Sequence, residues 1–337
     1  MLRMADRVYL DWNATAPLRP EARSAMVAAM DAVGNPSSVH AEGRAAMAII
    51  ERARAQVAEA FGAVGADIVF TSGATEAAGL ALAGRDLGGT GLEHDAVDAW
   101  LKRHGEDVVQ FANSETGVLA QLPEAFWLCD ATQAWGKLPI AFNWLGAQGA
   151  LASAHKLGGP KGAGALVLKR GTEIPAQLIG GGQEMGRRAG TENVIGIAGF
   201  GAAAEAAQRD LEAGVWDRVE KLRTILEKGI AAASDQTIFV GKDAKRLPNT
   251  SCFATPGWKG ETQVMSMDLA GFAISAGSAC SSGKVKESRV LRAMGYDELT
   301  ARSAVRVSLG PTTTQDEIER FVDAWGAACR KFRARAA

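Results

Sequence analysis

The sequence has few of the residues that build metal centres and disulfide frameworks. Its 337 residues include four cysteines and four histidines, but neither a Cys-x-x-Cys pair nor a His-Glu-x-x-His motif. The cysteines, Cys129, Cys252, Cys280 and Cys329, are widely scattered, and the histidines show no ligand spacing. We therefore expect no metal site and no disulfide-stabilised fold.

The chain also lacks a charge excess and a long apolar run. With 37 basic and 38 acidic residues, it has no basic surface that would indicate nucleic acid as a direct partner. The longest strongly apolar segment, Val194 to Ala204, is too short to span a bilayer, and residues 1–13 lack the apolar stretch of a signal peptide. These absences predict a soluble, cytoplasmic protein without a membrane partner.

What the sequence does contain is a recurring order of strand, turn of small residues, and helix. Apolar residues at helical spacing, such as Ala45, Ile49, Ala53 and Val57, predict a helix from Ala41 to Phe61. The segments DIVFTSGATEAAGLAL, DVVQFANSETG, FWLCDATQAWG and GALASAHKLGG each begin apolar and then present polar residues. This order is typical of an α/β fold with a mostly parallel sheet, whose ligands bind beyond the carboxyl ends of the strands.

The pattern changes after about Ala232. The segments TIFVG, NTSCFAT, FAISAG and AVRVSLG have the composition of strands, and residues 288–294 and 315–330 that of helices. A second, smaller α+β domain is therefore expected at the C-terminal end.

Polar residues at the predicted strand ends suggest one cofactor. Taken singly, Thr75 or Asp130 is an ordinary cap or turn residue, and His94 an ordinary structural histidine. Pyridoxal phosphate, however, needs a lysine amine, a carboxylate opposite its ring nitrogen, and hydroxyl and N–H groups around its phosphate. Lys156, Asp130 and the turn SGAT at residues 72–75 supply these three kinds of group, and His94 can stack on the ring or move a proton.

The chain resembles the cysteine desulfurases of the NifS/IscS type, which are class V aminotransferases of PLP fold-type I. The resemblance implies a large PLP-binding domain over residues 16–232, with a seven-stranded-type, mostly parallel sheet between helices. It also implies a small domain formed by residues 1–15 and 233–337. The matching stretches, in chain order, are YLDWNATAP, GNPSSVHAEG, VFTSGATEAAGLAL, EHDAV, NSETGV, DATQAWGKLPI, SAHKLGGPKGAGAL, GGGQEMGRRAGTEN, GSACSSG and AVRVSLGPTT.

The resemblance also implies how the cofactor and substrate are held. Lys156 is expected to bind the cofactor covalently, Asp130 to contact the pyridine nitrogen, and His94 to stack on the ring. Arg306, helped by Asn35, is expected to bind the carboxylate of L-cysteine, as guanidinium geometry favours. The remaining cofactor contacts are expected from Gln133 on the phenolic oxygen, from Ala74, Thr75, Ser153 and His155 on the phosphate, and from Thr191 on the phosphate of the neighbouring subunit of a homodimer.

Cys280 lies in the segment ISAGSACSSGKVKES. Free cysteines are often buried structural residues, but the glycines and serines here indicate a partly exposed loop, and Lys284 and Lys286 would favour a thiolate. The resemblance implies that Cys280 takes the substrate sulfur as a persulfide, leaving alanine. A protein acceptor for iron–sulfur cluster assembly or another thiolation pathway would then receive the persulfide sulfur. The segment that follows Cys280 is not shortened. In this respect the chain resembles the NifS/IscS group, which has a long loop here.

Two features depart from the family pattern. The family's Asn-Asn-Glu motif reads Asn113-Ser114-Glu115 here, so the shorter Ser114 is expected to reach the cofactor's phenolic oxygen weakly or through water. Thr75 and His94 are only 19 positions apart, which leaves room for about one helix and one short strand. The large domain therefore looks trimmed, which suggests a dedicated sulfur acceptor.

Other functions remain open. A class V aminotransferase or a selenocysteine lyase would keep Lys156, Asp130 and Arg306 but would not need Cys280 in the same way. A non-catalytic partner of sulfur-transfer proteins would not need all of these residues. Gly199 to Ala204 also matches the GxGxxA dinucleotide fingerprint, but close helix packing is the simpler explanation, with a helix capped by Thr191.

Overall fold

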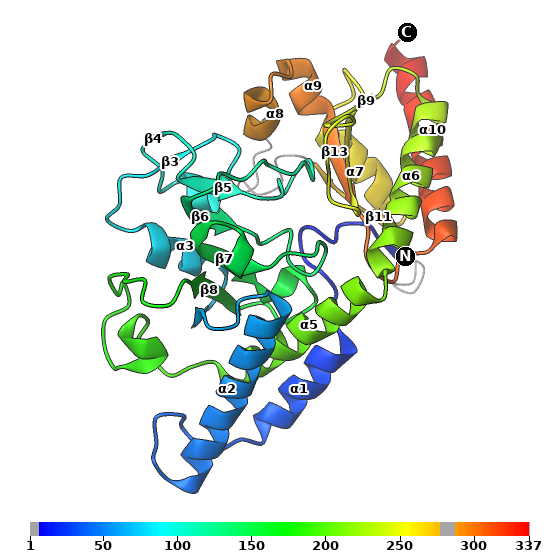
Figure 1. Ribbon diagram of the computed structural model, residues 1–337. Helices are drawn as coiled ribbons and strands as arrows, with labels where there is room; N and C mark the ends of the chain where they lie inside the picture. Colours follow the sequence, from blue (N-terminus) through cyan, green and yellow to red (C-terminus); the bar gives the residue numbers. More distant parts are fainter. Residues whose placement is uncertain (1–6, 277–286, 337) are drawn as a thin grey trace. The chain divides into compact units, whose positions relative to one another are not determined.

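The structure is a computed structural model that describes residues 7–276 and 287–336 (Figure 1). The chain forms two compact units. The large unit consists of Thr15–Ala112 and Ala120–Ala213, and the small unit of Met1–Ala14, Asn113–Leu119 and Gly214–Ala337. The large unit therefore ends at residue 213, whereas the sequence analysis placed the end of the large domain at residue 232.

A seven-stranded sheet forms the centre of the large unit. Only β8 runs against its neighbours, so the expected α/β fold with a mostly parallel sheet is confirmed. The strands, in sheet order, are β2 (Asp67–Thr71), β8 (Gly164–Leu168), β7 (Ala147–Ser153), β6 (Phe126–Asp130), β5 (Val108–Gln110), β3 (Gly88–Gly89) and β4 (Arg103–His104).

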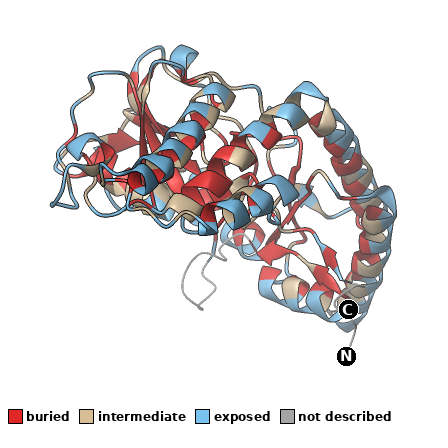
Figure 2. Ribbon diagram, turned by 90° about the horizontal axis from the view of Figure 1, so that it is seen from below, coloured by how far each residue is buried: buried red, intermediate tan, exposed pale blue. Residues whose placement is uncertain are grey.

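Both faces of this sheet are covered by helices, which explains why its strands read as apolar runs. Alternate residues of β2 face opposite apolar clusters: Ile68 and Phe70 belong to one, and Val69 to the other. Figure 2 shows the strands as mostly buried. The helical elements of the unit are α1 (Pro20–Met30), α2 (Ala41–Ala60), α3 (Ala74–Leu82), α4 (Asp95–Asp98), α5 (Val194–Glu212) and the short 3-10 turns η2 (Phe142–Trp144), η3 (Ala154–Lys156) and η4 (Gln183–Gly186).

Helix α2 confirms the helix expected from Ala41, and Ala53 and Val57 of its predicted face are buried, but the N-terminal half of that face is offset by one residue. Ala46 and Ile50 are buried, whereas Ala45 is exposed and Ile49 is only half-buried. Alanines occur all around this helix, so periodicity alone allowed a face that is offset by one residue. Packing against α5 decides which face is buried.

Small residues let α5 lie close to α1 and α2 (Figure 1). A Cβ atom on Gly199 would lie 2.6 Å from Met26 Cγ, and one on Gly201 would lie 2.7 Å from Ala53 Cα. The GxGxxA match thus reflects helix packing. The predicted cap of α5 was wrong: Asn193, not Thr191, accepts a hydrogen bond from the N–H of Gly196 at 3.0 Å. Thr191 lies two residues too early to reach that N–H.

The small unit contains an antiparallel sheet and a parallel strand pair. The predicted segments TIFVG, NTSCFAT and AVRVSLG each contain a strand, and helices are present at the two predicted positions, 288–294 and 315–330. The segment FAISAG divides into two strands, and the strand Val8–Tyr9 was not predicted. The sheet order is β12 (Ser275–Ala276), β13 (Ala304–Ser308), β10 (Thr250–Ala254) and β9 (Ile238–Phe239), and the pair is β1 (Val8–Tyr9) with β11 (Phe272–Ala273). The helices are α6 (Val215–Ala233), α7 (Gly260–Leu269), α8 (Arg289–Ala293), α9 (Glu298–Ser303) and α10 (Gln315–Ala336). Across both units, no helix in the described part of the chain has the length and apolarity of a membrane span.

The two glycines of α5 make a matched test of helix packing. Gly201→Ala should lower the free energy of unfolding by about 1–3 kcal/mol, because the new methyl group meets the backbone of Ala53. Gly199→Ala should change it by less than about 1 kcal/mol, because the flexible end of Met26 can move. Urea unfolding of both variants measures the difference, and equal stabilities would contradict this account.

Candidate active site

The key site residues of the large unit stand at one edge of its sheet. Strand β7 ends at Ser153 and turns directly into η3, which carries His155 and Lys156. The neighbouring parallel strand β6 ends at Asp130, which pairs with Leu151 of β7. Because adjacent parallel strands end at the same edge, the parallel pairing brings Asp130 to the same end of the sheet as Lys156.

Asp130 is a buried carboxylate with neutral hydrogen-bond donors. It is 4% exposed; its Oδ1 accepts from the N–H of Thr132 at 3.0 Å, and its Oδ2 from Gln110 Nε2 at 3.4 Å. No Lys, Arg or His side chain of the described residues forms an ion pair with it. The Thr132 hydroxyl beside it is buried without a hydrogen-bond partner in the same residues. A protonated pyridine nitrogen is the kind of cation that such a buried carboxylate favours.

The N-terminus of α3 fits a phosphate group. Gly73 precedes Ala74 and Thr75 at the start of this helix, and no side chain caps its first N–H groups. These groups and the helix dipole favour an anion. A Cβ atom built on Gly73 would lie 3.8 Å from Ser153 Oγ, so the Ser153 hydroxyl faces the same turn.

The acidic residue in the first turn of α3 is compensated. Glu76 accepts from Arg188 Nε at 2.7 Å and from the N–H of Ser72 at 2.8 Å. Burial works to raise the pKa of Glu76, but the hydrogen bonds from Arg188 and Ser72 outweigh it and lower the pKa. The ion pair with Arg188 reduces the repulsion that this carboxylate would exert on a phosphate.

His155 is held as a neutral ring. Its Nδ1 lies 3.2 Å from Thr15 Oγ1. Burial, followed by the positive charges of Lys156 and Lys161, lowers the pKa of His155 from 6.5 to about 4. When the Thr15 hydroxyl donates to Nδ1, the single ring proton is on Nε2, which can then donate a hydrogen bond to an anion.

Gln133 has a buried partner that sequence reasoning missed. Gln133 and Lys137 are 3% and 4% exposed, and Lys137 Nζ donates to Gln133 Oε1 at 2.7 Å. The contact fixes the amide orientation, because Oε1 must face the ammonium group of Lys137 and Nε2 therefore points away from it. Nε2 is a donor, as a contact to a phenolic oxygen requires. The only sequence signal was a lysine four positions after Gln133.

His94 and Asn35 each make a local backbone contact. His94 caps α4, and its Nδ1 accepts from the N–H of Ala96 at 3.2 Å, which fixes the ring. Asn35 lies in the exposed segment between α1 and α2, where its Oδ1 accepts from the N–H of Ser37 at 2.9 Å. These contacts do not test the predicted roles, so the stacking of His94 on the ring and the help of Asn35 in binding the substrate carboxylate stay predictions.

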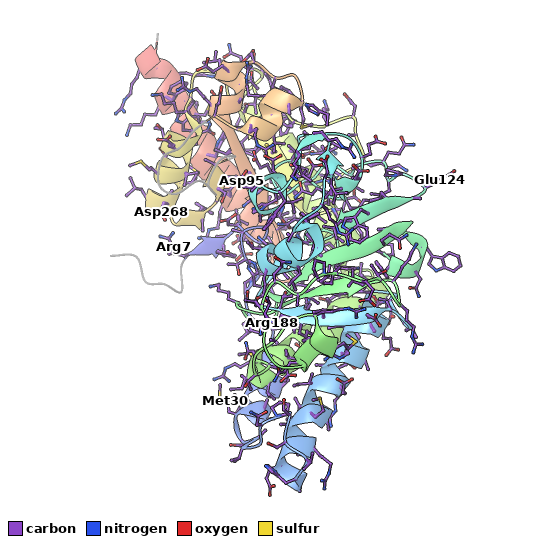
Figure 3. The ribbon with its side chains drawn as sticks, turned by 90° about the vertical axis from the view of Figure 1, so that its left-hand side faces the viewer. Arg7, Met30, Asp95, Glu124, Arg188 and Asp268 are labelled. Atoms are coloured by element: carbon purple, nitrogen blue, oxygen red, sulfur yellow. The ribbon has the colours of Figure 1, made fainter. Side chains whose placement is uncertain are left out.

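Thr191 is exposed on a segment that Glu184 anchors. Arg54 donates to the two oxygens of Glu184 at 2.9 and 3.0 Å, and the N–H of Phe70 donates to one of them at 2.9 Å. These bonds hold Glu184 and Met185 in the left-handed backbone region, with φ of 47° and 59°. Thr191, Ser72 and Arg188 line one pocket of about 260 Å³ in the large unit. Arg188 is labelled in Figure 3.

Arg306 belongs to the small unit, on β13. It is 7% exposed and donates to Asp11 Oδ1 at 2.7 Å and to the carbonyl of Ser114 at 2.9 Å. Ser114 thus contacts the arginine through its main chain, whatever its side chain does. Cys280 lies outside the described residues.

The comparisons with known proteins agree on one family. A model of the aminotransferase class-V family matches residues 8–97 and 108–321. The cysteine desulfurase of Cereibacter sphaeroides is 38% identical over 94% of this chain and 94% of that protein. The cysteine desulfurase IscS of Dictyoglomus turgidum is 32% identical over 98% of this chain and 96% of that protein. The solved structure of a NifS-like protein from Rickettsia africae has a TM-score of 0.85 at 30% identity, and the match covers 95% of this chain and 99% of that one.

The pKa of His155 predicts a pH-dependent stability. Between pH 6.5 and about 4 the unfolded chain binds a proton at this residue and the folded chain does not, so acidification over this range destabilises the fold. His155→Asn should therefore show a shallower loss of unfolding free energy from pH 7 to 4 than the unchanged chain. Urea unfolding of the cofactor-free protein at several pH values measures this, with the exposed His104→Asn as control. If the unfolding free energies of His155→Asn and of the unchanged chain fall in parallel with pH, the proposed effect of His155 is ruled out.

The Lys137 contact predicts weaker cofactor binding when it is lost. Lys137→Met keeps a long side chain but removes the donor that fixes Gln133 Oε1, so the dissociation constant for pyridoxal phosphate should rise about tenfold. Titration of cofactor-free protein, followed by absorbance, gives that constant. The exposed Lys102→Met is the control, and an unchanged constant for Lys137→Met would contradict the orienting role.

Proposed function

Because the chain belongs to the aminotransferase class-V family and is a cysteine desulfurase, we propose that it acts through Lys156, which holds pyridoxal phosphate, and Cys280, which receives the sulfur of L-cysteine. The observation that carries this proposal is the edge of the large-unit sheet where β6 ends at Asp130 and the parallel strand β7 runs into the turn that carries Lys156. The family depends on pyridoxal phosphate, and the residues at this edge are of the types that the cofactor needs.

The bound cofactor supplies an electron sink next to the substrate carbons. The chain's own residues supply the rest of the chemistry. Asp130 holds a proton on the ring nitrogen, Gln133 donates to the phenolic oxygen, and the N-terminus of α3 with Ser153 and His155 holds the phosphate. Arg306 binds the carboxylate of L-cysteine, because a guanidinium group matches a carboxylate with two parallel hydrogen bonds.

Sulfur transfer is proposed to occur on Cys280. Its thiolate attacks the sulfur of the bound cysteine, an S–S bond forms, and the C–S bond of the substrate breaks. The electron pair of that bond stays on the carbon side, where a proton completes L-alanine. Cys280 keeps the transferred sulfur as a persulfide, so no external oxidant is required.

We further propose a homodimer in which Thr191 reaches the phosphate of the neighbouring subunit. Thr191 is exposed in the single chain, and the segment that carries it also exposes large apolar side chains. Ile179 is 90% exposed and Met185 54% exposed. Exposed apolar groups of this kind are typical of a surface that a second chain covers.

The sulfur acceptor is proposed to be a cytoplasmic protein of iron–sulfur cluster assembly or of another thiolation pathway. The alignment with the Cereibacter protein extends over 369 positions, more than the 337 residues of this chain, so that relative has residues that are missing here. The family model also leaves residues 98–107 unmatched, between α4 and β5. This shortening supports a dedicated acceptor, and recovery of the scaffold protein of full-length relatives in a pull-down would count against it.

The desulfurase proposal is tested with L-cysteine and a thiol reductant. The unchanged enzyme should release alanine and sulfide, whereas Lys156→Ala and Cys280→Ser should each abolish sulfide release. Cys329→Ala, which removes a buried thiol on α10, should leave sulfide release within about twofold. If Cys280→Ser desulfurates as fast as the unchanged enzyme, a lyase or an aminotransferase should replace this function.

A further inference from the structure

The arginine proposed to bind the substrate carboxylate is already held by fixed groups. Arg306 places one nitrogen on Asp11 Oδ1 at 2.7 Å and another on the carbonyl of Ser114 at 2.9 Å. Its Nε is buried and has no hydrogen-bond partner among the described residues. The two acceptors bind different nitrogens of a planar group, so together they fix the orientation of its plane.

Asp11 is itself fixed through both of its carboxylate oxygens. Its Oδ1 binds Arg306, and its Oδ2 accepts from the hydroxyl of Ser275 at 2.9 Å. Its side chain is 17% exposed, so the ion pair is shielded from solvent more than a surface pair would be. Because Ser275 and Arg306 are paired residues on the adjacent strands β12 and β13, the sheet sets the positions of the two groups that bind Asp11.

The backbone around Asp11 is also anchored in the small unit. Asp11 forms a bridge with Ser308 at the end of β13, and the N–H of Asn13 donates to the Ser308 hydroxyl at 2.9 Å. The phenol of Tyr9 donates to the carbonyl of Asp11 at 3.0 Å. At the start of this segment Arg7 pairs with Asp268 of α7 (Figure 3). Asp11 is therefore not on a loose terminal arm.

We propose that Asp11, supported by Ser275, is a positioning residue that holds the Arg306 guanidinium in the orientation that binds the carboxylate of L-cysteine. The proposal rests on the role given to Arg306 under the proposed function. Asp11 acts through Arg306 and does not itself contact the substrate.

The geometry opposes the alternative that Asp11 competes with the substrate for Arg306. A competing carboxylate would be expected to bind two nitrogens with two oxygens, as a substrate carboxylate does. Asp11 uses one oxygen for Arg306, and Ser275 retains the other. Of the five N–H groups of the guanidinium, Asp11 and Ser114 take two, which leaves donors for an incoming carboxylate.

Steady-state kinetics of the holoenzyme tests the proposal. Asp11→Ala should raise KM for L-cysteine about 10- to 100-fold while kcat changes less than about threefold, because a lost hydrogen bond to a charged group costs about that much binding. Asp11→Asn, which retains an acceptor of the same shape, should raise KM less than Asp11→Ala. Ser275→Ala should raise KM about threefold. Glu298→Gln, which removes an exposed carboxylate that pairs with Arg302, is the matched control and should leave KM unchanged.

The effect should also disappear when Arg306 is absent. In the Arg306→Ala background, adding Asp11→Ala should raise KM no further, because Asp11 acts only through the arginine. A second readout is the binding of L-alanine and of ethylamine, which lacks the carboxylate, followed by cofactor absorbance. Asp11→Ala should weaken the binding of L-alanine and leave that of ethylamine unchanged.

The possible failures point to different errors. If Arg306→Ala leaves KM unchanged, the role of Arg306 under the proposed function is wrong, and this inference is overturned with it. If Arg306→Ala raises KM but Asp11→Ala and Asp11→Asn do not, only the positioning role is wrong. If Asp11→Ala lowers KM, Asp11 competes with the substrate, which also overturns the proposal. Unfolding midpoints of all variants separate these outcomes from a loss of fold.

Discussion

The site in the large unit depends on the parallel pairing of β6 with β7. This pairing brings the carboxyl ends of two strands together, so that Asp130 and the Ser153–Lys156 segment share one edge of the sheet. A shift of one residue in either strand would turn Asp130 to the opposite face. The apolar layers on both faces of the sheet hold the register, because a shift would expose buried side chains.

Charged groups around the site are each tied to a specific partner. Glu76 is compensated by Arg188, Glu184 by Arg54, and Lys137 donates to the Gln133 amide. Such pairing is required because an unpaired charge in a buried position is costly. In the small unit Arg306 and Asp11 follow the same rule. The partners therefore orient the groups that are proposed to meet the cofactor and the substrate.

Much of this architecture was predictable from local sequence. The strand, turn and helix order indicated the sheet, and the motif residues Asp130 and Ser153 do stand at strand ends, with Lys156 in the turn that follows Ser153. The prediction was weaker where composition was uniform. The alanine-rich helix α2 buries Ile50 and not Ala45, because only its contact with α5 selects among equivalent faces. The cap of α5 was likewise misplaced by two residues, since a cap depends on where the helix begins.

The sequence by itself determined the fold class, the family and the residue types proposed to bind the cofactor, because these follow from periodicity and from motifs that are contiguous in the chain. Only the tertiary structure decided the contacts between distant segments. Asp11 and Arg306 are 295 positions apart, and no local pattern indicates their ion pair. The burial of Lys137 and the neutral state of His155 were decided in the same way, because burial is a property of the packed chain.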